Sequence, residues 1–125
     1  MSAAKLSSDE LTAYFREGET PRSDWRVGTE HEKIGVYTDS HARVPFEGER
    51  GIGVLLERFA VEDDWERVFE AENVIALLKN GASVTLEPGG QMELSGAPLV
   101  TTGEACAEIG EHLELTKRVS ADMGI

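Results

Sequence analysis

Apolar and polar residues alternate over Leu86–Pro98, which reads LEPGGQMELSGAP. A period of two is typical of a strand with one apolar face and one polar face. Pro88–Gly90 interrupts the alternation, and because proline cannot donate to a sheet ladder while glycine tolerates positive φ, these residues predict a bulge or tight bend. The polar face then carries Glu87, Gln91 and Glu93 around that bend. This arrangement is consistent either with a binding site or with a solvated polar face.

The rest of the pattern predicts a hairpin, another strand and several helices. A continuous apolar run over 74–79 stops at Asn80-Gly81, which is a strong hairpin signal, and 83–87 returns beside it. A strand is also expected over 25–37, with 91–95 continuing the sheet beyond the bend. Helical spacing of apolar residues predicts helices over 7–17, 52–62 and 101–123, with one or two more helical turns over 65–69. The fold class is therefore α+β, a mainly antiparallel sheet with flanking helices.

Two of these helices open with a capping box, at Ser7–Glu10 and at Thr101–Glu104. The first helix has a narrow apolar stripe that suffices for docking onto a larger body. In the last helix, His112 borders the stripe and is predicted to be a packed residue. The stripe of the last helix is predicted to be Ala105, Ile109, Leu113, Thr116, Val119 and Met123.

A second acidic motif lies on the predicted strand over 25–37, where WRVGTEHEKIGVY sets Glu30 and Glu32 two residues apart. Residues i and i+2 share a face and lie roughly 6 to 7 Å apart, so both carboxylates can reach one hard cation. Carboxylates without paired histidine or cysteine favour Mg²⁺ or Mn²⁺ over zinc. By alternation Arg26 shares their face, whereas His31 and Lys33 point to the other.

Composition narrows the class of protein. The 125 residues suit one compact domain, and a formal net charge of -12 disfavours nucleic acid and anionic membranes as partners. The single cysteine, Cys106, excludes an internal disulfide framework and fits a reducing compartment. The first residues contain no apolar signal region, and no segment is long and apolar enough to span a bilayer. A cytoplasmic location is therefore expected.

The strings GTEHEKIG over 28–35 and LEPGGQMELSGAPL over 86–99 closely resemble the glutamate-cysteine ligases of the plant and proteobacterial type. The resemblance includes NVIALLKNG before the second string and the helix with Cys106 after it. Two long motifs in the family's order are far more specific than a lone ExE or GG. The resemblance implies a glutamine-synthetase-like sheet, of which residues 1–125 would be the amino-terminal portion of one catalytic domain.

The resemblance also implies an activity. Members of this family use ATP to convert the γ-carboxylate of glutamate into γ-glutamyl phosphate, which the amine of cysteine attacks in the first step of glutathione synthesis. Glu30, Glu32 and Glu93 match acids that bind Mg²⁺ or Mn²⁺ in related carboxylate-amine ligases, and Glu87 is a further metal candidate. The implied nucleotide- or substrate-binding residues are Arg26 and Gln91.

Several alternatives remain open at this point. Another carboxylate-amine ligase would have the same motifs, since the residues that select the amine lie outside them. The acids alone also permit a hydrolase with Glu87 and Glu93 as an acid and base pair, or a non-catalytic acidic module. At the position of Cys106, members of the family can carry a cysteine that forms a redox-sensitive disulfide, but burial in the core is predicted instead. Gly124 followed by a single residue predicts that the chain is truncated.

Overall fold

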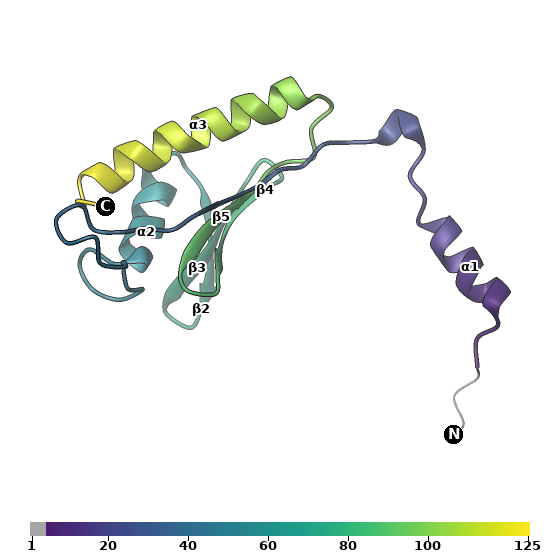
Figure 1. Ribbon diagram of the computed structural model, residues 1–125, viewed down its shortest axis with the longest axis horizontal. Coiled ribbons are helices and arrows are strands. Elements are labelled where there is room, and N and C mark those ends of the chain that lie inside the picture. Colours follow the sequence, from purple (N-terminus) through teal and green to yellow (C-terminus); the bar gives the residue numbers. More distant parts are fainter. Residues whose placement is uncertain (1–4) are drawn as a thin grey trace.

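The computed structural model of the chain describes residues 5–125, which form a five-stranded antiparallel sheet and three helices (Figure 1). The strand order is β1-β5-β4-β3-β2. The strands are β1 (Glu30–Lys33), β2 (Glu66–Glu70), β3 (Asn73–Lys79), β4 (Ala82–Glu87) and β5 (Gln91–Ser95). The helices are α1 (Ser8–Glu17), α2 (Ile52–Glu62) and α3 (Thr102–Ala121), with a short 3-10 turn at Arg22–Asp24.

Helices α2 and α3 cover the same face of the sheet, and the core lies between them and the strands (Figure 1). Phe59 and Leu56 of α2 are fully buried, as are Leu77 of β3 and Val84 of β4. Burial of such side chains is the main favourable contribution to folding. The other face of the sheet has no helix over it in the described part of the chain. In residues 5–125, no helix combines the length and the hydropathy needed to cross a membrane.

Two of the three hairpins of the sheet, β3–β4 and β4–β5, bear on the turn predictions. At the β3–β4 turn, Asn80 and Gly81 both adopt positive φ, at 51° and 85°, as a two-residue hairpin turn requires. At the β4–β5 turn, Gly89 and Gly90 have φ of 87° and 79°, and the amide of Gly90 donates to the carbonyl of Glu87. The predicted bend is thus a hairpin turn, and β5 pairs with β4 along its length.

The segment over 65–69 was predicted to be helical, and this prediction is wrong. Glu66–Glu70 is strand β2, which pairs antiparallel with β3 and has a register irregularity between Val68 and Phe69. Trp65 is buried, but Phe69 is 54% exposed, so these two aromatic residues do not pack inward together. A spacing of three and four residues favours a helix locally, but a five-residue segment gains more from ladder hydrogen bonds to an existing strand.

Strand β1 is shorter than the predicted 25–37. Regular pairing is confined to Glu30–Lys33, with isolated bridges from Val27 to Leu99 and from Val36 to Arg43. Between the pair Glu30–Ser95 and the bridge Val27–Leu99, the chain that leaves β5 has one more residue than the chain that enters β1. Pro98 lies within that stretch and cannot donate to a ladder. The segment therefore continues as isolated bridges instead of a strand.

Helix α1 forms as predicted but does not dock within the described chain. Its capping box is complete, with Ser7 Oγ accepting from the Glu10 amide at 3.2 Å. None of its residues is buried, and Tyr14 and Phe15 are each 74% exposed. Figure 1 shows α1 standing apart from the sheet. The predicted docking of its apolar stripe is therefore not observed in residues 5–125.

Helix α3 begins at the predicted capping box, in which Thr101 Oγ1 accepts from the Glu104 amide at 3.2 Å. Its inward face differs partly from the predicted stripe. Leu113 is only half-buried, whereas Leu115 is 3% exposed and His112 is 4% exposed. The prediction that His112 is packed is confirmed. The buried residues of this segment are Ala105, His112, Leu115, Val119 and Met123.

Candidate functional site

The uncovered face of the sheet carries the acidic residues that the sequence singled out. In antiparallel pairs, directly opposite residues project from the same face. Glu32 of β1 lies opposite Glu93 of β5, and Glu93 lies opposite Thr85 of β4. One row therefore places two carboxylates next to each other across three strands.

The neighbouring rows add further polar groups to this face. Glu30 of β1 lies opposite Ser95 of β5, and Glu87 of β4 lies opposite Gln91 of β5. Because Glu30 and Glu32, and likewise Gln91 and Glu93, are separated by two residues, all these positions project on the same side. We call the set Glu30, Glu32, Glu87, Gln91 and Glu93 the acidic face.

Burial along β5 separates the two sides of the sheet. Met92 and Leu94 are 4% and 1% exposed against the helices, whereas Gln91, Glu93 and Ser95 are half-buried on the acidic face. Glu30 and Glu32 on the edge strand are exposed. The acidic face is therefore accessible, with its chemistry on rigid strands and its apolar neighbours in the core.

Ser95 is a site residue that the sequence analysis missed. Its hydroxyl donates to Glu93 Oε1 at 2.7 Å and so fixes the orientation of that carboxylate. The alternation that found Glu93 also placed Ser95 on the same face, and this was the available signal. Thr85, opposite Glu93, was missed for a different reason, because the pairing between β4 and β5 depends on the turn geometry.

The two cations nearest to the β1 acids in sequence, Lys33 and Arg26, lie in different surroundings. Lys33 points to the helix-covered side, where its Nζ donates to the carbonyl of His31 at 3.1 Å and burial lowers the pKa of its amine. Arg26 is exposed before β1, and its Nη1 donates to the carbonyl of Trp25 at 2.8 Å. The acidic face is thus poor in cations in the described chain.

The acidic face offers hard oxygen donors of the kind that Mg²⁺ and Mn²⁺ prefer. Within residues 5–125, no group of three or more acidic, histidine or cysteine side chains converges closely enough to hold a metal ion by itself. Magnesium usually retains waters and takes only one or two carboxylates together with substrate phosphates. The donor chemistry of Glu30, Glu32 and Glu93 therefore fits such an ion when phosphate oxygens complete its coordination.

A comparison with protein families decides where this chain belongs. The family described as "Glutamate-cysteine ligase family 2 (GCS2)" matches residues 26–125, which include the whole sheet, α2 and α3. The chain belongs to this family. Its α+β architecture is that of the glutamine-synthetase-like ligases, as the two sequence motifs implied.

Curated glutamate-cysteine ligases are similar over nearly the entire chain. Glutamate-cysteine ligase A, chloroplastic, of Oryza sativa subsp. japonica is 45% identical over 121 residues, covering 96% of this chain and 24% of its own length. The chloroplastic enzyme of Nicotiana tabacum is 42% identical over 125 residues, 100% of this chain and 23% of its own length. That of Arabidopsis thaliana is 40% identical over 120 residues, 96% of this chain and 22% of its own length. The chain thus spans about a quarter of the length of these relatives.

The family comparison corrects the expected location. The sequence analysis predicted a cytoplasmic protein, but the relatives above are all named as chloroplastic enzymes. The prediction depended on the absence of an apolar signal region. Chloroplast transit peptides are amphipathic and rich in serine and arginine, so they lack such a region as well. The absence of an apolar signal region argues against secretion, but it does not distinguish a cytoplasmic protein from a chloroplastic one.

Cys106 is exposed, so the prediction of a core cysteine is wrong. Ala105 is buried on the inward face of α3, and the next residue is turned by about 100° around the helix axis. His112, by contrast, packs beneath α3 with its ring centroid 5.7 Å from that of Phe59. Its burial and the nearby Lys33 and His31 lower its pKa to about 4.

Proposed function

We propose that this chain is the amino-terminal portion of the catalytic domain of a glutamate-cysteine ligase. In this reaction an oxygen of the glutamate γ-carboxylate attacks the γ-phosphorus of ATP, and ADP leaves. The amine of cysteine then attacks the carbonyl carbon of γ-glutamyl phosphate, inorganic phosphate leaves, and γ-glutamylcysteine forms as the first product of glutathione synthesis. Membership of glutamate-cysteine ligase family 2 supports this proposal.

The observation that carries the proposal is the row formed by Glu32 and Glu93, with Glu30 beside it, on an uncovered sheet face. These carboxylates would hold Mg²⁺ or Mn²⁺. When bound, the cation neutralises negative charge on the phosphates and so lowers the barrier to phosphoryl transfer. Strand-borne carboxylates suit this role because their positions vary little.

The other residues of the face have supporting roles in this proposal. Ser95 restrains the Glu93 carboxylate through its hydrogen bond at 2.7 Å. Glu87 and Gln91 face each other at the end of the β4–β5 hairpin and can contact the metal or the substrate from there. Arg26 is the nearest exposed cation in sequence and would contact an anionic substrate.

Activity requires more cations than this chain presents. Several of its cations already pair with acids on other surfaces, among them Lys79 with Asp63 at 2.8 Å and Arg67 with Glu57 at 2.7 Å. A nucleotide and a dicarboxylate substrate both carry negative charge, and an acidic face without counter-cations binds them poorly. We therefore infer that the remaining cationic groups come from parts of the longer enzyme.

Calorimetric titration with MgCl2 tests the metal role. The wild-type chain should bind weakly, and Glu32→Gln should weaken binding about tenfold, as expected when one charged oxygen ligand is lost. Glu72→Gln, an exposed acid in the β2–β3 turn, makes the same charge change as a matched control and should bind Mg²⁺ as the wild type does. Circular dichroism checks that each variant is folded. Equal affinity in wild type and Glu32→Gln would remove Glu32 from the proposed site.

Product analysis by mass spectrometry tests the ligase assignment. With ATP, glutamate, cysteine and MgCl2, the chain alone should give no γ-glutamylcysteine, whereas a longer chain that includes the rest of the catalytic domain should form it. Product formation by the 125-residue chain at about 1 per second, a rate ordinary for an enzyme, would show that the chain has all the necessary groups. Failure of the longer chain with cysteine but success with another amine would identify a different carboxylate-amine ligase.

A further inference from the structure

The ladder between β1 and β5 becomes irregular directly beyond the acidic face. The amide of Gly96 donates to the carbonyl of Thr29 at 2.7 Å, next to the opposed pair of Glu30 and Ser95. Regular pairing stops there, because the chain that leaves β5 has one extra residue before the bridge at Leu99. An irregularity of this kind leaves a backbone amide without its ladder partner.

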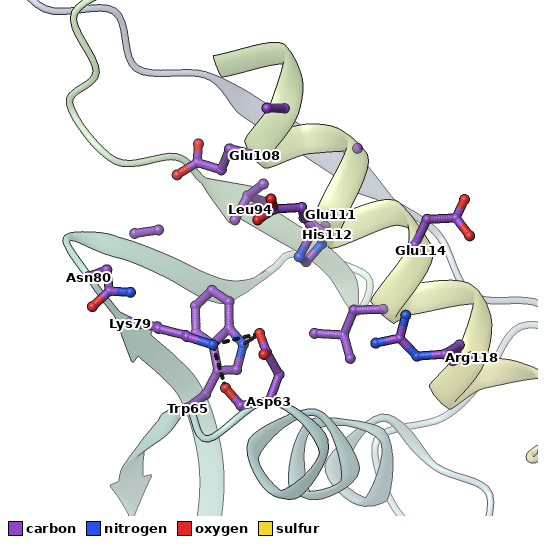
Figure 2. A pocket seen from close by; sticks show the side chains of 14 residues that line it. Asp63, Trp65, Lys79, Asn80, Leu94, Glu108, Glu111, His112, Glu114 and Arg118 are labelled. Atoms are coloured by element: carbon purple, nitrogen blue, oxygen red, sulfur yellow. Dashed lines mark hydrogen bonds and ion pairs between the residues drawn. The ribbon is translucent and has the colours of Figure 1, made fainter. Parts of the chain in front are cut away.

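A carboxylate from α3 supplies the missing partner. Glu108 Oε1 accepts from the amide of Ala97 at 2.9 Å. The next residue, Pro98, has no amide to donate. Figure 2 shows the Glu108 side chain projecting from α3 towards the chain that leaves β5, whereas Glu114 extends away from the sheet. Helix α3 is therefore fastened to the end of β5 by the Glu108 side chain.

The second oxygen of this carboxylate lies in a closed space. Glu108 Oε2 and the hydroxyl oxygen of Thr29 are both shielded from solvent, and neither has a hydrogen-bond partner within residues 5–125. Both lie within 2.8 Å of the point that a Cβ on residue 96 would occupy. A buried carboxylate oxygen without a donor is costly, and a threonine hydroxyl can rotate to donate. Because solvent reaches neither atom, the two groups are complementary partners.

Gly96 makes room for this contact. Its φ is not positive, so the backbone at this position does not by itself require glycine. The requirement is one of space, since a Cβ would meet Glu108 Oε2 and Thr29 Oγ1. The carboxylate cannot turn away from such a Cβ without losing the bond that Oε1 accepts from the amide of Ala97. The missing side chain thus allows α3, β1 and β5 to meet at one point.

The fastened segment adjoins the groups that orient the metal candidates. Ser95 immediately precedes Gly96, and its hydroxyl donates to Glu93 Oε1 at 2.7 Å. Glu30 immediately follows Thr29 and lies opposite Ser95. A shift of the pair formed by Gly96 and Thr29 would therefore move both the hydroxyl that restrains Glu93 and the backbone of Glu30. Groups that hold metal ligands in place change the metal affinity when they are removed.

We propose that Glu108 is a positioning residue for the acidic face. Its carboxylate accepts from the amide of Ala97 and from the hydroxyl of Thr29, and so fixes where Glu30 and Ser95 lie. This inference rests on the proposed metal role of the acidic face. Glu108 is not itself a metal ligand in this proposal, because α3 lies on the other side of the sheet (Figure 1).

Calorimetric titration with MgCl2 and NMR of the backbone amides test the proposal on two variants of Glu108. Glu108→Leu removes both acceptor oxygens and should weaken Mg²⁺ binding about fivefold, the equivalent of one net hydrogen bond. It should also move the amide-proton signal of Ala97 upfield and change the amide signals of Glu30 and Ser95. Glu108→Gln keeps an oxygen for the Ala97 amide and gains an NH2 group that can donate to Thr29, so it should behave as the wild type does.

Gly96→Ala tests the same junction without altering Glu108. The added methyl group should separate Glu108 from Thr29 and weaken Mg²⁺ binding by a similar factor. Gly110→Ala is the matched control, because nothing lies within 4 Å of a Cβ there, and it should leave the affinity unchanged. Val119→Ala, at a position 6% exposed near the other end of α3, should lower the free energy of unfolding without changing the affinity for Mg²⁺. Circular dichroism checks that each variant is folded.

Several results would overturn the proposal. One is unchanged Mg²⁺ affinity in folded Glu108→Leu or Gly96→Ala, and another is unchanged amide signals of Glu30 and Ser95 in Glu108→Leu. Equal weakening by Val119→Ala would show that the titration reports overall stability, and equal weakening by Glu108→Gln would assign the effect to charge. If the wild type bound no Mg²⁺, the proposed function would fail, whereas the amide signals would still decide whether Glu108 positions these residues.

Discussion

The two faces of the same sheet differ in what covers them and therefore in what each residue contributes. On strand β5, Leu94 is 1% exposed against α2 and α3, while the adjacent Glu93 projects from the other face, where no helix of residues 5–125 lies. Removing apolar area from water stabilises the fold, whereas an accessible carboxylate contributes little to stability. Neighbouring residues on one strand thus serve stability and chemistry separately, and substitutions on the two faces should have different consequences.

The largest expected effect is on the covered face. Leu94→Ala should lower the free energy of unfolding by about 2 to 5 kcal/mol, because it removes buried methyl groups and leaves a cavity. Urea denaturation followed by circular dichroism measures this loss. Glu93→Ala on the same strand is the matched control and should cost no more than about 1.5 kcal/mol, the contribution of its hydrogen bond with Ser95. Similar losses for both variants would break the comparison by showing that the acidic face is also packed against something.

The next effect concerns pH and again depends on the covered face. Folding lowers the pKa of His112 from 6.5 to about 4, so between these values the unfolded chain binds more protons than the folded chain. Stability contributed by neutral His112 is therefore complete above pH 6.5 and is lost as the pH falls towards 4, by about 3 kcal/mol in total. His112→Leu should remove this part of the pH dependence in urea titrations at pH 4.5 and 7.

Carboxylates whose pKa values are lowered, such as those of Glu104 and Asp63, also lose stabilising interactions at acid pH. Their contribution is complete above the unfolded pKa values of 4.5 and 3.8 and is lost as the pH falls below them, at the lower end of the range where His112 acts, and it is common to wild type and variant. The difference between the two proteins therefore isolates His112. An unchanged pH dependence in His112→Leu would mean that folding does not lower the pKa of His112.

The smallest effect on stability is expected at Ser95 on the acidic face. Ser95→Ala removes one half-buried hydrogen bond to Glu93 and should change the free energy of unfolding by about 0.5 to 1.5 kcal/mol. Ser95→Ala should also lower the affinity for Mg²⁺, because the Glu93 carboxylate is no longer held by the Ser95 hydroxyl and must be ordered again when the metal binds. Ser83→Ala, at the position opposite Ser95 on β4, is the control and should leave Mg²⁺ binding unchanged. Equal metal affinity in Ser95→Ala would restrict Ser95 to a structural role.

Several features of the fold were predictable because they are local. Asn80-Gly81 fixes a hairpin by its own φ preferences, and the capping boxes at Ser7 and Thr101 start their helices through contacts three residues apart. Alternation with period two placed Glu30 with Glu32, and Gln91 with Glu93, on common faces without reference to any other strand. The family motifs pointed to the same residues.

Other features depended on contacts between distant segments. Trp65 and Phe69 have helical spacing, but pairing with β3 makes their segment a strand. Helix α1 has a complete capping box, yet none of its residues is buried against another part of residues 5–125. Cys106 carries no local signal that sets it apart from a buried cysteine.

The sequence by itself determined which residues of each strand share a side, because side-chain direction along a strand follows from the backbone alone. Only the tertiary structure decided that Glu32 lies opposite Glu93, since their strands are about sixty residues apart and their register depends on the whole sheet. The same holds for His112, a residue of α3 that becomes buried only when the helix packs on the strands. Local backbone preferences are encoded residue by residue, whereas burial and register are set by the free energy of the complete fold.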